Sequence, residues 1–327
     1  MGTYSASQMW NWARELPEQL AAEPLGLEDR TAPDRAPRRI LVCGMGGSGV
    51  SAQFLAALGP FIPWRWAGAP DWLGPEDALL AVSHSGGTWE TLRTVRDALD
   101  RHSAVYGVTG GGELARLLDE HGATRLSVPD GMPPRAAFGH LLGACLRLGE
   151  RLLGTALWRS DAVVDELRAS RDGLADDDYT WLGELARALA GRQLVVYGTC
   201  PLSAAAALRW KQQLNENAKQ FCWCNALPEA AHNEVEAAGP GDPPRRIVLT
   251  LGDEAPPLDT ILDDYGDSVV LTAPAGPAVF RALHLVLLGD LLSLLIARER
   301  AVDPGGIPRI AAFKQTGWAR RFYGGDN

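Results

Sequence analysis

The chain of 327 residues has little of what marks secreted, metal-binding or nucleic-acid-binding proteins. Its 31 lysines and arginines face 40 aspartates and glutamates, and this net charge of −9 argues against a nucleic-acid partner. The five cysteines are an odd number and no export signal accompanies them, which indicates reduced thiols in a cytoplasmic protein. Cys222 and Cys224 have no second pair at zinc spacing, so we expect small buried residues there and no metal site.

Long hydrophobic runs are also missing. The first residues show no basic segment followed by an apolar core, so no signal peptide is expected. The longest apolar stretch, 282–297, is interrupted by His284, Gly289 and Asp290 and is shorter than a bilayer requires. We therefore predict a buried helix there and no membrane partner.

What the chain does contain is an alternation of short β-rich runs and helical patterns. Such an alternation predicts an α/β fold with a doubly wound parallel sheet. The composition, 46% hydrophobic and 22% charged, suits a globular protein with enough length for two domains. The predicted strands are residues 40–43, 78–82, 104–108 and 125–128 in the first half, and 194–197, 247–251 and 269–272 in the second.

The two halves resemble each other. "ILVCGMGGSGVSAQFLAAL" from residue 40 and "LVVYGTCPLSAAAALRWKQ" from residue 194 each read as a strand, a turn of small residues and a helix. A second matching pair, "RLSVPDGMPPRAAFGHLLGACLRLG" and "SVVLTAPAGPAVFRALHLVLLGDLL", reads as a strand, a Pro/Gly turn and an apolar helix. We infer an internal duplication into domains 1–155 and 156–327, with the join in the charged helical region between Leu153 and Ala190.

The first half carries two polar glycine loops. "GMGGSG", residues 44–49, has the G-x-G-x-x-G spacing of dinucleotide-binding turns, but that use also needs an acidic residue closing the next strand. Only Asp71 is available, and it follows a proline in a turn. The second loop, "SHSGGT" at 83–88, groups three hydroxyl side chains around two glycines before a predicted helix. The alternative that Ser85 or Thr88 is only an N-cap stays open for that loop alone.

Two such loops after neighbouring strands favour a site for one phosphate group. Loops at the carboxyl ends of parallel strands converge, and helix N-termini offer free N–H groups to an anion. "SHSGGT" has no counterpart in the second half, and "GMGGSG" is replaced there by "GTCPLS". We therefore expect a single ligand pocket per chain.

These loops resemble those of sugar isomerase (SIS) domains, which are flavodoxin-like and bind phosphosugars. The segment "KQQLNENAKQFCWCNALPEAAHNEVEA", 211–237, is similar to the bifunctional phosphoglucose/phosphomannose isomerases, and the likeness extends from about residue 40 to 314. It implies a metal-independent, cofactor-free homodimer of two SIS domains per chain that interconverts glucose 6-phosphate, and mannose 6-phosphate, with fructose 6-phosphate through a cis-enediolate. The phosphate would be held by Gly47, Ser48, Ser83, Ser85 and Thr88.

Four further residues are candidates for the chemistry. A carboxylate partly withdrawn from water can take and return a proton near neutrality, and the resemblance gives this role to Glu216. The resemblance also implies that His232 opens the sugar ring from across the dimer interface, with assistance from Lys314. Arg135 could stabilise the enediolate oxygens, because its guanidinium stays protonated. His84 competes with His232, although its expected contribution is a backbone N–H.

The chain departs from the family pattern at three positions. Ala231 stands where asparagine commonly precedes the histidine, His84 where tyrosine is frequent, and Trp89 where a polar residue is usual. None of these removes a proposed catalytic group. A non-catalytic SIS protein that senses a phosphosugar is the alternative function, and it would need the glycine loops without the four catalytic candidates.

Overall fold

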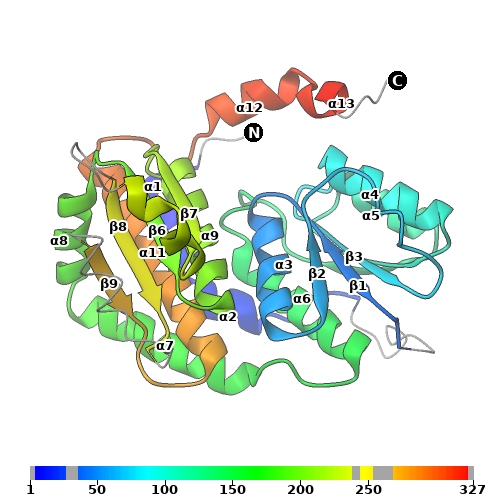
Figure 1. Cartoon of the computed structure of the whole chain (residues 1–327), viewed down its shortest axis with the longest axis horizontal. Helices are drawn as coiled ribbons and strands as arrows, with labels where there is room; N and C mark the ends of the chain where they lie inside the picture. Colours follow the sequence, from blue (N-terminus) through cyan, green and yellow to red (C-terminus); the bar gives the residue numbers. More distant parts are fainter. Residues whose placement is uncertain (1–3, 27–35, 238–243, 253–267, 323–327) are drawn as a thin grey trace. The chain divides into compact units, whose positions relative to one another are not determined.

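A computed structural model describes residues 4–26, 36–237, 244–252 and 268–322. The chain forms two compact units. Unit 1 contains residues 1–17 and 160–306, and unit 2 contains 18–159 and 307–327 (Figure 1). A compact unit need not coincide with a duplicated ancestral domain, so the ranges 1–155 and 156–327 stay a prediction.

Unit 2 is built on a five-stranded sheet with the order β2-β1-β3-β4-β5, in which every pairing is parallel. Helices α3 and α6 cover one face and α4 and α5 the other (Figure 1). The elements are α2 (Leu16–Ala21, most of which belongs to unit 2), β1 (Ile40–Cys43), α3 (Gly47–Leu58), β2 (Phe61–Trp64), β3 (Ala78–Ser83), α4 (Trp89–Asp100), β4 (Ala104–Thr109), α5 (Gly112–Glu120), β5 (Thr124–Ser127), α6 (Phe138–Leu153), α12 (Pro308–Gln315) and α13 (Trp318–Phe322).

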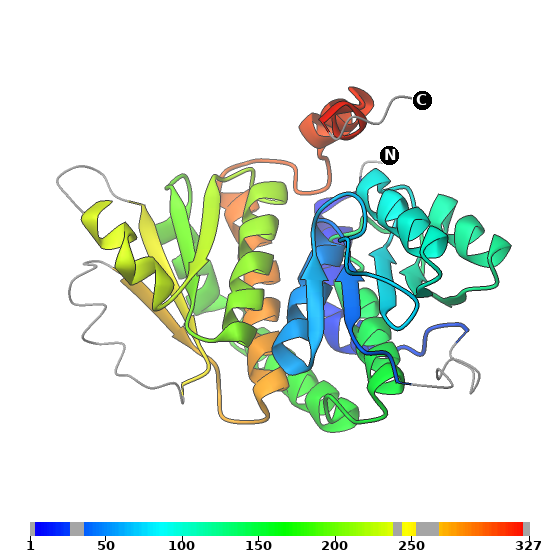
Figure 2. The same ribbon diagram turned by 45° about the vertical axis from the view of Figure 1, so that its right-hand side comes forward.

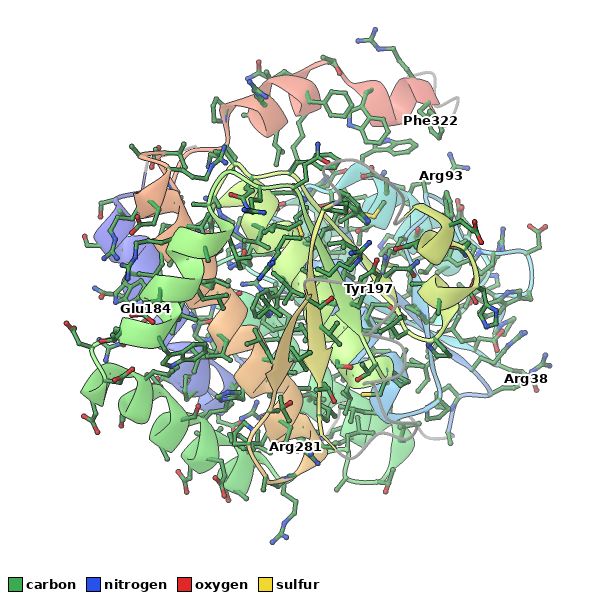
Figure 3. The ribbon with its side chains drawn as sticks, turned by 60° about the vertical axis from the view of Figure 1, so that its left-hand side comes forward. Arg38, Arg93, Glu184, Tyr197, Arg281 and Phe322 are labelled. Carbon is green, nitrogen blue, oxygen red and sulfur yellow. The ribbon has the colours of Figure 1, made fainter. Side chains whose placement is uncertain are left out.

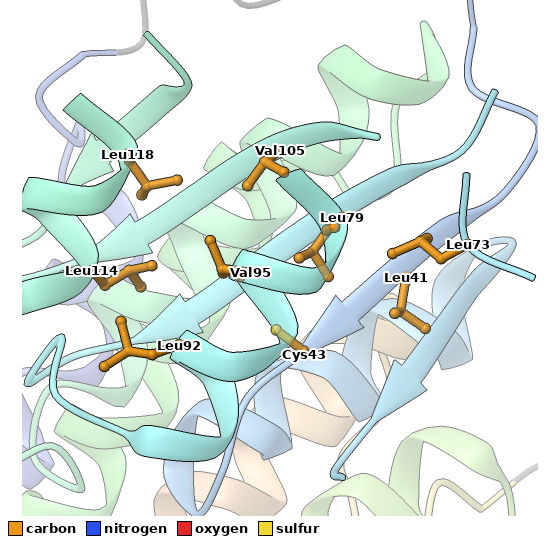
Figure 4. Close-up of a cluster of buried hydrophobic side chains, with 11 residues drawn as sticks. Leu41, Cys43, Leu73, Leu79, Leu92, Val95, Val105, Leu114 and Leu118 are labelled. Atoms are coloured by element: carbon orange, nitrogen blue, oxygen red, sulfur yellow. The ribbon is translucent and has the colours of Figure 1, made fainter. Parts of the chain in front are cut away.

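The central strands of this sheet are apolar on both faces because helices cover both. Every residue of β1 and β3 is buried. On the α4–α5 side, Leu41 and Leu79 of the sheet pack against Val95 of α4 and Leu114 of α5 (Figure 4). This core fixes the start of α4 relative to the carboxyl ends of the strands.

Unit 1 contains a four-stranded parallel sheet in the order β7-β6-β8-β9. Helix α9 lies along one face, and the short 3₁₀ helices η2 and η3 lie on the opposite face (Figure 2). The elements are α1 (Ala6–Arg14), α7 (Ser160–Asp176), α8 (Thr180–Leu189), β6 (Leu194–Gly198), α9 (Pro201–Glu216), β7 (Cys222–Ala226), η2 (Glu229–His232), η3 (Glu234–Ala237), β8 (Arg245–Thr250), β9 (Ser268–Thr272) and α11 (Ala278–Glu299).

The first four strands of both sheets follow one order, in which the first strand lies between the second and the third. This shared order agrees with a common topology, and the internal duplication remains an inference. One correspondence differs from the match between the two halves of the sequence. The strand before α11 is β9, and the sequence match predicted that it corresponds to β5. In the structure β9 pairs with β8, just as β4 pairs with β3, so its position in the sheet corresponds to that of β4.

All seven predicted strands are present, and β2 and β7 were missed. Both missed strands lie at the edge of their sheets. An edge strand pairs on one side only, so it tolerates Pro63 in β2 and the polar, half-buried residues of β7, and its sequence carries a weaker apolar signal.

The long apolar stretch forms α11, as predicted. By length and composition this helix could cross a membrane, but 89% of its most apolar window is buried inside the protein, as in the core helix of a soluble protein. The five cysteines are all free. Cys222 is buried as expected, whereas Cys224 is half-buried, and burial raises the pKa of Cys43 to about 12.

Candidate active site

The two glycine loops meet at one edge of the unit 2 sheet. Strands β1 and β3 are parallel neighbours, with Cys43 paired to Ala81, so the loops that follow them leave the sheet side by side. Helix α3 begins at Gly47 and α4 at Trp89, and neither helix has a side-chain cap on its N-terminal amides. Two adjacent uncapped helix N-termini form a site suited to an anion.

The hydroxyl groups of the second loop do not serve as helix caps. Thr88 occupies the N-cap position of α4, but its hydroxyl lies 3.1 Å from the Ser83 hydroxyl and makes no cap bond. The side chain of Ser85 also makes no cap bond to α4. It is exposed, and its hydroxyl accepts only a long bond of 3.4 Å from the Gly87 amide. Thr88 therefore stands at the N-cap position without a side-chain cap bond, and the phosphate-binding role of both hydroxyls stays a prediction.

The β3–α4 loop is supported by the loop that follows β4. A Cβ on Gly86 would come within 1.8 Å of the Gly111 carbonyl oxygen, and one on Gly112 within 2.4 Å of the Ser85 carbonyl oxygen. The Leu114 amide donates to the Gly86 carbonyl at 2.8 Å. These backbone contacts require glycine and hold the candidate phosphate loop in one conformation.

The first loop depends on close packing between strand and helix. A Cβ on Gly44 would lie 2.9 Å from the Val82 carbonyl oxygen, and one on Gly49 would lie 2.8 Å from the Gly44 carbonyl oxygen. The glycines thus let α3 start directly against the sheet, with Ser48 buried in its first turn. Strand β2 ends at Trp64, and Asp71 is fully exposed, so the acidic residue of a dinucleotide site is not at the end of that strand.

His84 connects the phosphate loop to the segment that carries Arg135. Its side chain is buried and its Nε2 donates to the Pro129 carbonyl at 3.0 Å, since a carbonyl can only accept. Burial lowers the pKa of His84, which favours the neutral ring. Arg135 is buried in the turn that joins β5 to α6, within the same unit. The His84 ring is thereby turned into the protein, in contrast to the exposed His232.

Glu216 is the last residue of α9 and is half-buried. Its neighbours, whose polar character suggested a catalytic segment, have structural partners. The Asn215 amide exchanges two hydrogen bonds with the backbone of Cys222, and Asn217 Nδ2 donates to Ser293 Oγ at 3.0 Å. Lys219 Nζ donates to the Glu216 carbonyl and, at 2.7 Å, to the Gly306 carbonyl. The position of Glu216 is therefore tightly held.

His232 and Glu216 lie on elements that cover opposite faces of the unit 1 sheet. Helix α9 starts beside the carboxyl end of β6, so Glu216 lies at the amino edge, where Asn215 binds the first residue of β7. His232 is exposed in η2, which follows β7 and packs on the face opposite α9, where Ala230 clusters with Val195 and Tyr197.

Lys314 is exposed on α12, in unit 2. Gly47, Ser48, Ser83, Ser85 and Thr88 are gathered at the two glycine loops of the same unit. Within the described ranges, no three His, Cys, Asp or Glu side chains are arranged to hold a metal ion.

The corresponding loop of unit 1 is filled by its own side chain. Ser203 Oγ accepts from the amides of Thr199 at 2.8 Å and Cys200 at 2.9 Å. In the matched sequences Ser203 stands where the first loop has Gly49. A buried hydroxyl thus occupies these two amides, and the single ligand pocket per chain stays a prediction.

Glu234, which sequence reasoning missed, anchors the segment around His232. Its carboxylate accepts hydrogen bonds from Tyr197 Oη at 2.5 Å and Asn225 Nδ2 at 2.6 Å. The only signal in the sequence was an acidic residue two positions after the histidine, in a polar stretch without periodicity.

The parallel sheets covered by helices and the paired glycine loops define a protein of the SIS class. The fold is similar to that of the C-terminal domain of glucosamine-fructose-6-phosphate aminotransferase from Francisella tularensis, with a TM-score of 0.67 and 14% identity over 91% of this chain and 98% of that one. Residues 183–316 match the family described as the bacterial phospho-glucose isomerase C-terminal SIS domain.

Two curated relatives identify the family. The chain is 30% identical over 305 residues to the bifunctional phosphoglucose/phosphomannose isomerase of Aquifex aeolicus, covering 87% of this chain and 92% of that protein. It is 26% identical over 317 residues to the protein of the same name from Thermoplasma volcanium, covering 91% and 99%. The chain belongs to the family of bifunctional phosphoglucose/phosphomannose isomerases.

Proposed function

We propose that this protein is a cytoplasmic aldose–ketose isomerase that interconverts glucose 6-phosphate and mannose 6-phosphate with fructose 6-phosphate. The observation that carries the proposal is the pair of uncapped helix N-termini at adjacent strands, in a chain that matches this family over most of its length. A phosphate group held there anchors the sugar at a point that is remote from the reacting carbons C1 and C2. Binding energy at that remote group can then orient C1 and C2 for reaction.

The reaction begins with opening of the sugar ring. In the proposed step His232 delivers a proton to the ring oxygen while a water molecule accepts the proton of the anomeric hydroxyl. The bond between C1 and the ring oxygen breaks and a carbonyl forms at C1. Lys314 assists this step as a cationic donor. The open chain stays attached through its phosphate.

The proton then moves between the two carbons. In the aldose-to-ketose direction, the Glu216 carboxylate removes the proton from C2, and the electron pair forms the C1=C2 bond of a cis-enediolate. Glu216 returns the proton to C1 while the O2 hydroxyl proton passes to O1, which leaves a hydroxymethyl group at C1 and the carbonyl at C2. The Arg135 guanidinium stabilises the negative charge on the enediolate oxygens. Proton return to either face of C2 in the reverse direction gives glucose or mannose 6-phosphate.

The proposal includes a homodimer in which each site uses the partner's His232. The support is topological, because Glu216 and His232 of one chain lie on elements that cover opposite faces of the same sheet. A histidine from a second copy removes the need for one residue to reach across that sheet.

The test follows both products from fructose 6-phosphate, using the purified protein after chelator treatment. Turnover to glucose 6-phosphate and mannose 6-phosphate is measured for the wild type, for Glu216→Gln and for the control Glu184→Gln, which changes an exposed glutamate on α8. Loss of a general base lowers the rate on the order of 10²- to 10⁴-fold, so Glu216→Gln should be nearly inactive and Glu184→Gln unchanged.

Binding is measured in parallel as protection of the protein from urea unfolding by fructose 6-phosphate. Protection should persist in Glu216→Gln, because the phosphate loops lie in the other unit. Full turnover in Glu216→Gln would remove this residue as the base. Protection of the wild type without any product would favour the sensor function instead.

A further inference from the structure

Glu234 receives its two hydrogen bonds from a matched pair of strand residues. Tyr197 of β6 and Asn225 of β7 are register partners in neighbouring parallel strands, so their side chains emerge side by side from one face. Both donate to the Glu234 carboxylate, the tyrosine hydroxyl at 2.5 Å and the asparagine amide at 2.6 Å. Tyr197 lies over the unit 1 sheet (Figure 3). Hydrogen bonds to an ionised carboxylate are stronger than those between neutral groups.

The residues just before His232 are held by apolar packing. Ala230 is fully buried in a cluster with Val195, Tyr197 and Val248, and Ala231 packs against the same cluster. The methyl group of Ala231 therefore contributes to the packing of η2 on the sheet.

The segment itself has little rigidity of its own. Helices η2 and η3 span four residues each, and η2 has no side-chain cap at its start. Short 3₁₀ helices have poor hydrogen-bond geometry, so their conformation depends on tertiary contacts. His232 and Asn233 are exposed between the packed alanines on one side and Glu234 on the other.

We propose that Glu234 is a positioning residue. Its hydrogen bonds with Tyr197 and Asn225 fix the orientation from which His232 opens the sugar ring. The inference rests on the proposed function of His232. Without Glu234 the segment loses the side-chain hydrogen bonds that tie it to β6 and β7, and the imidazole then samples more orientations. A displacement near 1 Å can lower a rate by about 10²-fold, so the effect on ring opening should be large.

Ring opening can be measured apart from isomerisation. In the Glu216→Gln background the proton transfer between carbons is blocked, but opening and reclosure still interconvert the α and β anomers of glucose 6-phosphate. Exchange NMR measures this interconversion above its spontaneous rate. The variants added to this background are His232→Ala, Glu234→Ala, Glu234→Gln and Tyr197→Phe. The matched control is Glu236→Gln, which changes an exposed glutamate of the same 3₁₀ helix.

We expect His232→Ala to abolish the catalysed interconversion and Glu234→Ala to lower it roughly 10- to 100-fold. Glu234→Gln and Tyr197→Phe, which each keep part of the hydrogen-bond set, should fall between these limits, and Glu236→Gln should have no effect. Urea unfolding curves of each variant show whether it is folded at the assay temperature, and Glu234→Gln serves where Glu234→Ala is not folded.

The outcomes separate the two hypotheses. If His232→Ala leaves the interconversion unchanged, or the Glu216→Gln background shows none, the ring-opening role of His232 in the proposed function is wrong. If His232→Ala abolishes it and the Glu234 variants do not lower it, the positioning role of Glu234 is overturned. An equal loss in Glu236→Gln would also overturn it, because the effect would not depend on the contact with Tyr197 and Asn225.

Discussion

Replacing Gly86 by alanine should damage the candidate phosphate loop more than the same change at Gly122. The two glycines have nearly the same left-handed backbone, with φ of 62° and 61°. They differ in what a new Cβ would meet. At Gly86 it would lie 1.8 Å from the Gly111 carbonyl oxygen, whereas at Gly122 nothing lies within 4 Å. Gly122→Ala is therefore a control for backbone strain alone.

The expected free-energy difference follows from these contacts. A left-handed alanine costs roughly 1–2 kcal/mol at either position. At Gly86 the loop must also move away from Gly111, which breaks the hydrogen bonds from the Leu114 amide to Gly86 and from the Gly110 amide to His84. Each contributes about 0.5–1.5 kcal/mol. Gly86→Ala should then lower the free energy of unfolding by about 2–5 kcal/mol, and Gly122→Ala by about 1–2 kcal/mol.

Urea unfolding measures the stability of each variant, and steady-state kinetics measures the KM for fructose 6-phosphate. Because the moved loop carries Ser83, Ser85 and Thr88, the KM should rise in Gly86→Ala and stay near the wild-type value in Gly122→Ala. Equal stability losses in the two variants would refute the inference that the β4–α5 loop braces the phosphate loop. A destabilised Gly86→Ala with unchanged KM would remove this loop from phosphate binding.

Two further predictions concern buried polar groups of unit 1. Burial lowers the pKa of His284 from 6.5 to about 4, so the unfolded chain binds a proton at this histidine more readily than the folded chain does. The free energy of unfolding should therefore fall by up to about 3 kcal/mol as the pH drops from 6.5 to 4. The free energy of unfolding of His284→Gln should fall less steeply across this range, and equal slopes for the variant and the wild type would contradict the prediction. In the second prediction, Asp290→Asn removes the carboxylate whose Oδ2 lies 2.8 Å from Nη2 of the buried Arg209. The free energy of unfolding, measured in urea, should fall by about 3–5 kcal/mol. The control Asp165→Asn, at an exposed ion pair, should lower it by less than about 1 kcal/mol.

The interior strands could be predicted because their signal is local. A strand covered by helices on both faces is a continuous apolar run, as in β1 and β3, and the glycine-rich turns that follow mark the ends. Strands β2 and β7 could not be recognised in this way. Each has one hydrogen-bonded neighbour, so proline and polar residues remain compatible with it.

The candidate site was predictable only in part for a related reason. Residue types and spacing indicated the two loops, and the order of the strands brought them together. The partners of individual side chains come from distant segments. His84 binds Pro129, and Glu234 binds Tyr197, at separations of 45 and 37 residues. No local pattern encodes such a pair.

The sequence by itself determined the α/β class, the two glycine turns and the helices that begin after them, because backbone conformation there depends on neighbouring residues. Only the tertiary structure decided that the Thr88 hydroxyl turns to Ser83, that Gly86 must lack a Cβ, and that the elements carrying Glu216 and His232 cover opposite faces of one sheet. These features depend on which segments pack together, and packing joins residues that the chain keeps apart.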